Sequence, residues 1–595
     1  MGDHLTSSGQ LFRQTVTEPN TRPTVTRNPD GPVPHHGGTR APIVPGLPPL
    51  SRSPPMSSRA VPSFVAPQEI AMSTTDNPTQ KVQAVEPDEG GRGSRFLDLV
   101  ERAGNALPHP FWLFWILCGV VTVASWALNA ADLKVKDPSS GDMVGVRSAL
   151  SADAVRDLIS GAQESYVLFG PLGTVLMVML GVAVAERSGL FEALARRMLS
   201  GLSPRMVVLG VALGGVLGKF LSDSAYVVLI PLGAVAFRAV GRSPMLGMIV
   251  AFVSINAAGD ANPLIAPGDA LFASVATEAA QLVDEDAVVR ATDNMYFTTV
   301  SAFVLAGTIA LVVDKILAKR EHHLIPDDDL EAIASQQVVA AEVDDDTEVR
   351  ALKLTALAVV GYASLVGLAL LPASSPLRGE GGALVESTFM NAISVFLTAF
   401  FLLVGAVYGR LTGRIRGNRA IPEAMAEGVR FIAPLLVLFF AVAQFVALFK
   451  WTNIATVVAV EGAGFLKQLG APTLVLFSVL IAAVALMNLL ITSGSALWAL
   501  VAPALVPMLL LLGTNPATTM ALYRIADSCT NSITPMSTSF VLCVGYLQTL
   551  RRKAGIGTLV SFTLPVAMIM LAVWVLLFFV WYLLGIPLGP GAPVR

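Results

Sequence analysis

The sequence predicts an all-α polytopic membrane protein arranged as an inverted repeat. The 595 residues are 53% hydrophobic and only 14% charged, and long apolar runs recur from residue 109 onward, which is typical of membrane proteins. Lys and Arg gather in alternate connections between these runs, as in cytoplasmic loops. Polar residues and helix breakers interrupt the apolar runs in two regions of related order, which indicates non-helical backbone buried in protein at membrane depth.

The first 90 residues differ from the rest of the chain. They are rich in Pro, Ser, Thr, Gly and Arg and lack apolar periodicity, which is typical of disorder. We therefore expect a disordered tail over 1–90, a membrane domain over 91–585, and a short C-terminal tail over 586–595. An inert tail is the simplest interpretation of 1–90, and binding to a partner or to anionic lipid is the alternative.

Uninterrupted spans are expected where an apolar run approaches the roughly 20 residues that a helix needs to cross a bilayer. Charged connections separate them, and the basic ones mark the cytoplasmic side. This rule places the N-terminus and the charged loop 318–350 in the cytoplasm, and the C-terminus outside. The polar segment 131–164 is expected as an outer connection, and 452–468 along the outer surface. The expected spans are 109–130, 165–186, 295–317, 352–372, 389–409, 430–449 and 557–585.

The region 206–283 does not fit uninterrupted spans. Residues 206–240 form two apolar arms around Ser222-Asp223-Ser224, and both ends are basic. Each arm is too short to cross, so we expect a re-entrant hairpin with Asp223 at its tip. Residues 244–283 follow as one span that is unwound at its centre.

The region 472–549 repeats this order with opposite topology. Residues 472–512 form two short apolar arms around Thr492 to Ser495, and 516–549 form a second broken span around Asp527 to Pro535. The total is about nine transmembrane helices plus two opposed re-entrant hairpins. Inverted repeats with paired broken helices are typical of secondary transporters with a midplane site and alternating access.

Several other function classes lack their sequence signals. There is no Walker A motif, no GxSxG motif and no CxxC pair, and the spans after His109 contain no histidine. A net charge of −3 gives no indication of a nucleic-acid partner. The leading interpretation is a secondary transporter without a cofactor, located in the cytoplasmic membrane. An intramembrane enzyme and an ion channel remain as alternatives, and a channel would need a continuous polar lining.

Three blocks carry a resemblance to a known family: SDSAYVVLIPLGA (222–234), SGSALWALVAPALVPMLLLLGTNP (493–516) and YRIADSCTNSITP (523–535). They resemble the AbgT family of p-aminobenzoyl-glutamate transporters over roughly residues 90–585. The resemblance implies a homodimer, nine transmembrane helices and two re-entrant hairpins. It also implies ion-driven uptake of p-aminobenzoyl-glutamate or efflux of sulfonamide antimetabolites.

The resemblance also implies site residues. Those that match the family's functional positions are Asp223, Ser495, Trp498, Pro516, Arg524, Asp527 and Pro535. The first broken span departs from the family's pattern, because GDANPLI stands where a GYSANLL-like run is expected. A transporter of a different small organic anion therefore remains an alternative.

The chemistry of these side chains suits an aromatic dicarboxylate. The planar guanidinium of Arg524 can form two parallel hydrogen bonds with a carboxylate, and Trp498 can stack on an aromatic ring. Ser495 and Asn531 can form hydrogen bonds with the cargo. Arg524 and Asp527 are three residues apart and share a helix face, so a self-neutralising ion pair is an almost equally good interpretation.

Ion coupling by H⁺ or Na⁺ is assigned to Asp223, Asp527, Asn262 and Asp260. Desolvation disfavours a lone buried carboxylate, so such a group takes up a proton or holds a cation. Asp223 is alternatively a cap of its hairpin tip, and water can reach Asp260 in an unwound segment. A Na⁺ near Asp223, Asn262 and Asn531 would receive oxygen ligands, although the amides can equally satisfy freed backbone groups.

Overall fold

The computed structural model describes residues 108–136, 141–199, 202–218, 224–324, 326, 345–384 and 387–595. The chain separates into two units, 1–85 and 86–595. All described residues belong to the second unit. The expected hairpin tip at Asp223 and the expected disorder of 1–90 lie outside the described residues.

Among the described residues, seven helices or continuous helical runs are long and apolar enough to cross a membrane, by length and composition. The all-helical prediction is confirmed at this level, apart from a small antiparallel hairpin of β1 (Lys134–Lys136) and β2 (Met143–Gly145). The seven are α2 (Pro110–Ala130), α3 with α4 (Ala152–Val167, Gly170–Arg187), α10 with its irregular extension (Met295–His323), α12 (Asp345–Leu370), α14 (Ile393–Leu411), α15 (Ala420–Trp451) and α21 (Ile556–Leu584).

Two connections contain more helix than the sequence suggested. The expected polar connection 131–164 carries β1 and β2 and then enters α3, where the Ser151 side chain accepts a hydrogen bond from the Ala154 N–H. Serine at an N-cap satisfies one of the free N–H groups of the first turn. Helix α15 begins at Ala420, ten residues before the expected span. Both extensions carry charged residues, so apolar content alone marked only the apolar parts of these helices.

The first interrupted region consists of α6 (Val207–Gly218), α7 (Ser224–Ala239), α8 (Pro244–Ala257) and α9 (Pro267–Ala280). Helix α6 packs on α7 and α8, and α7 packs on α8. Gly233 and Gly247 allow the α7–α8 contact, because a Cβ at Gly233 would lie 2.5 Å from the Gly247 carbonyl oxygen. The helix is interrupted between Ala257 and Pro267, as expected for a broken span.

The second interrupted region consists of α17 (Thr473–Asn488), α18 (Gly494–Leu510), α19 (Pro516–Asn531) and α20 (Thr538–Gln548). Helix α19 packs against α17 and α18, and also against α8 and α9 of the first region. The two regions, which are separated by the chain between Ala280 and Thr473, therefore meet at α19.

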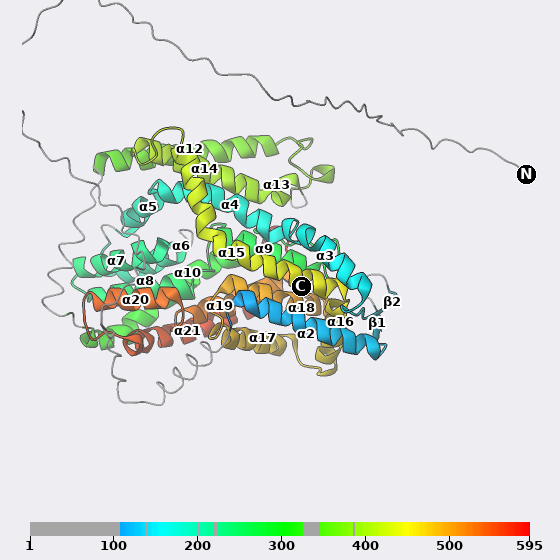
Figure 1. Cartoon of the computed structure of the whole chain (residues 1–595). Helices are drawn as coiled ribbons and strands as arrows, with labels where there is room; N and C mark the ends of the chain where they lie inside the picture. The colour runs from blue at the N-terminus through cyan, green and yellow to red at the C-terminus, as the bar shows by residue number, and fades with distance from the viewer. Residues whose placement is uncertain are drawn as a thin grey trace, which may run out of the picture. The chain divides into compact units, whose positions relative to one another are not determined.

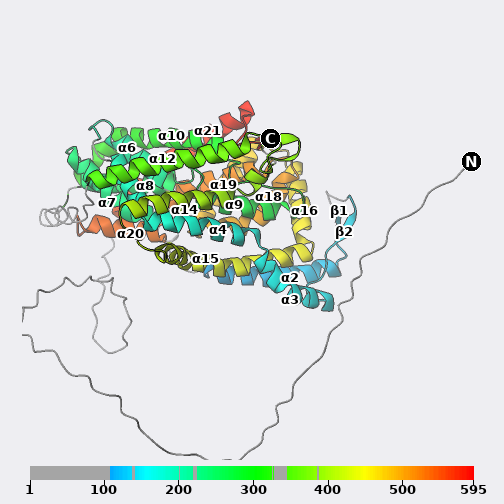
Figure 2. The same cartoon turned by 90° about the horizontal axis from the view of Figure 1, so that it is seen from above.

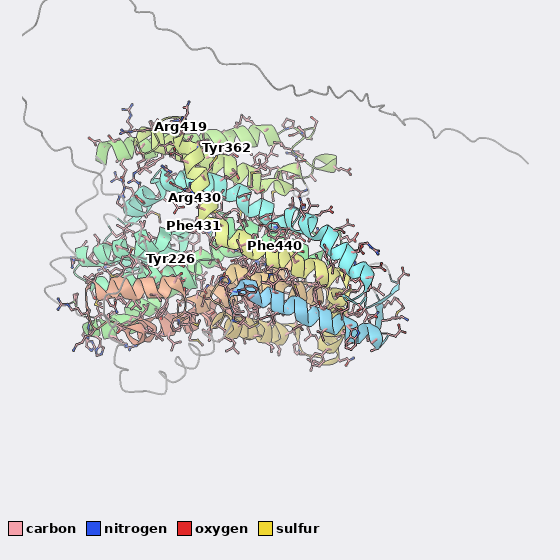
Figure 3. All side chains as sticks on the ribbon, viewed as in Figure 1. Tyr226, Tyr362, Arg419, Arg430, Phe431 and Phe440 are labelled. Carbon is pink, nitrogen blue, oxygen red and sulfur yellow. The ribbon has the colours of Figure 1, made fainter. Side chains whose placement is uncertain are left out.

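The longer helices lie around these regions. Helix α12 packs on α14, and α14 packs on α4, from one edge of the structure inward (Figure 1). Helix α15 starts near this edge and runs to α2, with which it lies side by side (Figure 2). Along α15, Arg419, Arg430, Phe431 and Phe440 follow one another (Figure 3). Phe431 is 53% exposed, which suits a lipid-facing position.

The last ten residues fold back onto the helices. Leu588, Ala592 and Val594 are buried. The Leu588 carbonyl accepts hydrogen bonds from the N–H groups of Tyr296 and Phe297 at the start of α10. The segment 586–595 is thus part of the packed helical unit.

Candidate functional site

A cavity of about 850 Å³ lies where the two interrupted regions meet. It is bordered by α7, the break between α8 and α9, the start of α18, the end of α19 and the start of α20. Tyr226 of α7, whose position Figure 3 shows, is one of its lining residues. The charged lining residues among the described part are Asp260, Asp269, Arg524 and Asp527, and the polar ones include Asn256, Asn262, Thr492, Ser493, Ser495, Asn531, Ser537 and Ser539.

The two breaks are held together by hydrogen bonds between distant parts of the chain. The Asp260 N–H donates to Ser528 Oγ at 3.3 Å, and Cys529 Sγ lies 3.7 Å from the Ala257 carbonyl oxygen. Ser539 Oγ donates to Asn256 Oδ1 at 3.3 Å. Unwound backbone groups need such partners when water is excluded. These contacts place both unwound segments at one site.

Arg524 forms a buried ion pair with Asp269. Arg524 Nη1 lies 2.5 Å from Asp269 Oδ1, and the Arg524 side chain is 3% exposed. The other Asp269 oxygen, Oδ2, accepts a hydrogen bond from the Ala266 N–H at 2.6 Å. Asp269 thus caps the start of α9 and neutralises Arg524 at the same time. Its capping role was foreseeable from the sequence, whereas its pairing with Arg524 required the tertiary structure.

Part of the Arg524 guanidinium has no polar partner in the described part of the chain. Its Nε and Nη2 atoms are buried without a hydrogen bond there. The guanidinium carbon lies 5.0 Å from the centre of the Phe272 ring, which also lines the cavity. An arginine between an aromatic ring and a cavity is suited to a planar carboxylate.

Asp527 lies against the turn between α17 and α18. Its Oδ1 atom accepts a hydrogen bond from Tyr523 Oη at 3.2 Å, and its Oδ2 atom accepts one from Asn531 Nδ2 at 3.3 Å. A Cβ added to Gly494 would lie only 2.8 Å from Asp527 Oδ2. The first residue of α18 must therefore be glycine for the turn before α18 to approach Asp527 this closely.

Asn488, the last residue of α17, joins this helix to α19. Its Nδ2 atom lies 2.8 Å from the Asp527 carbonyl oxygen, 2.7 Å from Thr530 Oγ1 and 3.0 Å from Asn531 Oδ1. Asn488 is fully buried. It fixes the end of α19 relative to α17, and it is a site residue that the sequence did not reveal.

Trp498 lies behind the cavity wall. It is fully buried, and its Nε1 atom donates to the Phe272 carbonyl at 2.9 Å. Its ring lies 4.6 Å from that of Tyr523, which packs edge-on against Phe272 at 5.6 Å. Phe272 and Tyr226 are the aromatic residues that line the cavity in the described part of the chain, and Trp498 supports Phe272 from α18.

The predicted site residues fall into three groups. Ser495, Arg524, Asp527, Asn531, Asn262 and Asp260 line the cavity. Trp498, Pro516 and Pro535 are not among its lining residues. Pro516 begins α19, next to Asn515, whose side chain accepts from the Ala517 N–H, and Pro535 lies in the break between α19 and α20. Asp223, the third group, lies outside the described residues.

The two amides proposed as Na⁺ ligands already have local partners. Asn262 Oδ1 accepts the Leu264 N–H at 2.9 Å, which is the backbone role named as an alternative above. Asn531 Oδ1 accepts from Asn488 Nδ2. An amide oxygen has a second lone pair, so these bonds leave one acceptor position on each.

The match to known proteins covers nearly all of the described chain. Residues 95–595 match the model of the AbgT putative transporter family. The chain belongs to this family. The family prediction from the three sequence blocks is thereby confirmed, and with it the assignment as a multi-pass membrane transporter.

Relatives of this AbgT-family transporter include one characterised protein and two solved structures. The chain is 33% identical to the p-aminobenzoyl-glutamate transport protein of Escherichia coli (strain K12), over 83% of this chain and 95% of the relative. It is 36% identical to the Alcanivorax borkumensis YdaH transporter, with a TM-score of 0.75 over 81% of this chain and 100% of the other.

The second structure is that of Neisseria gonorrhoeae MtrF, which is described as illuminating a class of antimetabolite efflux pumps. The chain is 38% identical to MtrF, with a TM-score of 0.79 over 84% of this chain and 100% of that one. The family and all three relatives are transporters. An enzymatic activity therefore has no support from these similarities.

Proposed function

We propose that this protein is an ion-coupled secondary transporter for p-aminobenzoyl-glutamate or related aromatic carboxylate and sulfonamide compounds. It moves them across the cytoplasmic membrane by alternating access. The cargo class follows the printed functions of the E. coli and N. gonorrhoeae relatives. The observation that carries the proposal is the cavity between two broken helices, with Arg524 beside it. Discontinuous helices that meet near the midplane are the usual site of such transporters.

Arg524 is the proposed carboxylate anchor. It has two buried N–H positions without a partner in the described part of the chain, and a carboxylate can accept both in a planar, bidentate geometry. Phe272, beside the guanidinium, supplies a ring on which an aromatic cargo can pack. Ser495 and Asn531 line the same space and supply hydrogen bonds.

The charge of the cavity supports coupling to a cation. Its described charged residues are one arginine against three aspartates, Asp260, Asp269 and Asp527. A dicarboxylate entering this surplus of negative charge would be repelled by several kcal/mol at the effective dielectric of a partly buried site. Uptake of H⁺ by a carboxylate, or of Na⁺ between carboxylate and amide oxygens, removes this repulsion. We assign this coupling role to Asp223, Asp527, Asp260 and Asn262.

We further propose nine spans, two re-entrant hairpins and a homodimer. Seven candidate spans, together with the broken pairs α8–α9 and α19–α20, make nine crossings. Helices α6 with α7, and α17 with α18, form the two hairpins. The N-terminus is cytoplasmic and the C-terminus is outside. The short lengths of these eight helices, 11–17 residues each, support this division, because none reaches the roughly 20 residues of a full span.

Transport into proteoliposomes tests the function directly. The purified full-length protein is expected to accumulate or expel labelled p-aminobenzoyl-glutamate or a sulfonamide when a pH or Na⁺ gradient is imposed. Flux that is independent of both gradients would contradict secondary transport. Flux of neither compound, with a gradient-driven flux of another organic anion, would reassign the cargo.

Four variants locate the site within the same assay. Asp223→Ala and Asp527→Ala are expected to abolish gradient-driven flux, and Arg524→Lys to lower it by weakening bidentate binding. Asp269→Asn leaves Arg524 buried without its counter-charge and is also expected to abolish flux. Glu164→Gln, an exposed position on α3, is the control and retains flux. Wild-type flux in both aspartate-to-alanine variants would show that the site lies elsewhere.

A further inference from the structure

A second cavity of about 400 Å³ lies away from the central one, between α3, the start of α4, α9 and the end of α15. Its size falls within the range of about 300–1,000 Å³ that is usual for small-molecule sites. Its polar lining residues are Asp157, Ser165, Glu278, Lys450 and Trp451, and its apolar ones are Leu158, Leu168, Phe169, Ala443, Val446 and Ala447. None of these residues lines the central cavity.

Two carboxylates at this cavity each use only one oxygen in hydrogen bonds with the described residues. Glu278 Oε1 accepts the Gly170 N–H at 2.9 Å, at the start of α4. Asp157 Oδ2 accepts from Trp451 Nε1 at 3.2 Å. These bonds hold both carboxylates at the cavity wall, and the second oxygen of each is available to a ligand.

Lys450 supplies the opposite charge. It lines the cavity and makes no ion pair with any residue that the structure describes. Its charge lies within electrostatic range of Glu278. The lining therefore combines two negative groups with one positive group. A ligand with an ammonium and a single anionic group matches this set, whereas a dicarboxylate would meet a net negative surface.

The surroundings of the cavity are those of a membrane interface. Lys450 and Trp451 end the long apolar helix α15, and Trp and Lys are typical of helix ends at the headgroup level. The Arg147 guanidinium lies 3.7 Å from the centre of the Trp451 ring and holds it. Next to the cavity, Leu168 is 69% exposed, and Ile159 on α3 is 72% exposed. Such apolar surface suits the acyl chains of a bound lipid.

We propose that this cavity binds the headgroup of a phospholipid that carries a primary ammonium. The ammonium lies between Asp157 and Glu278, the phosphate pairs with Lys450, and the acyl chains follow the exposed apolar residues Ile159 and Leu168. Glu278 and Asp269 lie on the same helix, α9, nine residues and about 14 Å apart. A lipid at Glu278 thus stabilises the helix whose other end holds Arg524. The inference stands independently of the transported compound.

Native mass spectrometry of the full-length protein in detergent tests the inference. Phosphatidylethanolamine is expected to bind at least threefold more tightly than phosphatidylglycerol, which lacks the ammonium, and more tightly than phosphatidylcholine, whose ammonium has no N–H. The double variant Asp157→Asn/Glu278→Gln is expected to abolish this preference, because it keeps the oxygen acceptors for Trp451 and Gly170 but removes both charges. Glu164→Gln, also on α3, is the control and retains it.

Other results decide against the proposal. Equal binding of the ethanolamine and glycerol lipids, or an unchanged preference in the double variant, would overturn it. Displacement of the lipid by p-aminobenzoyl-glutamate would instead identify a second cargo site, and tight binding of glycerophosphoethanolamine would identify a soluble zwitterion as the ligand. If the double variant does not fold, Lys450→Gln at an exposed position serves in its place, with at least a threefold loss of affinity for phosphatidylethanolamine expected.

Discussion

Arg524 and Asp269 illustrate why a charged pair persists in an apolar protein. Removing one partner of a buried ion pair costs about 3–5 kcal/mol, because the other charge stays buried and unpaired. The pair is also linked to backbone structure, since Asp269 accepts the Ala266 N–H at the broken end of α9. A cargo carboxylate on Nε and Nη2 of Arg524 would share this cation with Asp269, which uses Nη1. The position of α9 would then respond to cargo binding.

Asp293 gives a pH-dependent test at the residue scale, in the connection between α9 and α10. It is buried, and it accepts the Arg290 N–H at 2.9 Å. Burial raises its pKa to about 6, against the opposing effects of that hydrogen bond and of the Arg290 charge. The folded pKa lies above the unfolded value of about 3.9, so folded protein takes up a proton between these values.

This shift predicts that stability falls as the pH rises from about 4 to about 6, and that the loss of about 3 kcal/mol remains above pH 6. Asp293→Asn removes this titration. The difference in unfolding temperature between variant and wild type is therefore expected to grow in favour of the variant from pH 4 to pH 6, measured in detergent. A difference that does not change with pH would show that Asp293 titrates normally.

At the scale of elements, each break is stabilised by a partner from another segment. Helix α19 ends near Asn531, where Asn488 of α17 binds three oxygen atoms of its last turn. The turn between α17 and α18 can approach Asp527 because Gly494, the first residue of α18, lacks a side chain. The turn before α18 and the end of α19 are therefore in direct contact. A substitution at Gly494 is expected to change the position of the Asp527 carboxylate.

Gly494→Ala tests this contact. The added methyl would lie 2.8 Å from Asp527 Oδ2 and 3.1 Å from Oδ1, so the tip must move away. Gradient-driven flux is expected to fall by about tenfold, equivalent to about 1.4 kcal/mol, while membrane insertion is retained. Gly464→Ala in α16 (Ile454–Gln468) is a matched control, because its methyl would meet nothing within 4 Å. Equal flux in the two variants would show that close contact at the tip is dispensable.

At the scale of the whole molecule, the two interrupted regions face each other across one cavity, and longer helices surround them. The C-terminal segment 586–595 connects α19 to α10. Thr518 Oγ1 of α19 donates to the Val594 carbonyl at 2.9 Å, and the Leu588 carbonyl accepts from the start of α10. If α8 and α9 together cross the membrane once, as proposed, the connection between α9 and α10 lies outside the cell.

Thiol labelling in whole cells tests this crossing. An impermeant reagent is expected to label Glu285→Cys, after α9, from outside. It is expected to label Arg205→Cys, before α6, and Lys553→Cys, after α20, only in permeabilised cells. All three positions are exposed, and the three native cysteines are buried. Labelling of Glu285→Cys and Arg205→Cys from the same side would mean that the segment between them crosses an even number of times.

The sequence by itself determined the membrane class and the order of long and interrupted apolar segments, and it named six of the described residues that line the cavity. Apolar length and breaker residues act locally, so Ser495, Arg524 and Asp527 could be recognised from their immediate neighbours in an apolar run. The family was identifiable for the same reason, because its motifs are continuous blocks.

Only the tertiary structure decided which of these groups meet. Asp269 pairs with Arg524 across 255 positions, Trp498 supports Phe272 from behind, and Asn488 anchors α19. Such partners are chosen by packing between helices distant in sequence, and no local pattern encodes them. The sequence favoured Asp527 over Asp269 because three residues along a helix is a visible spacing, whereas a contact between α9 and α19 is not.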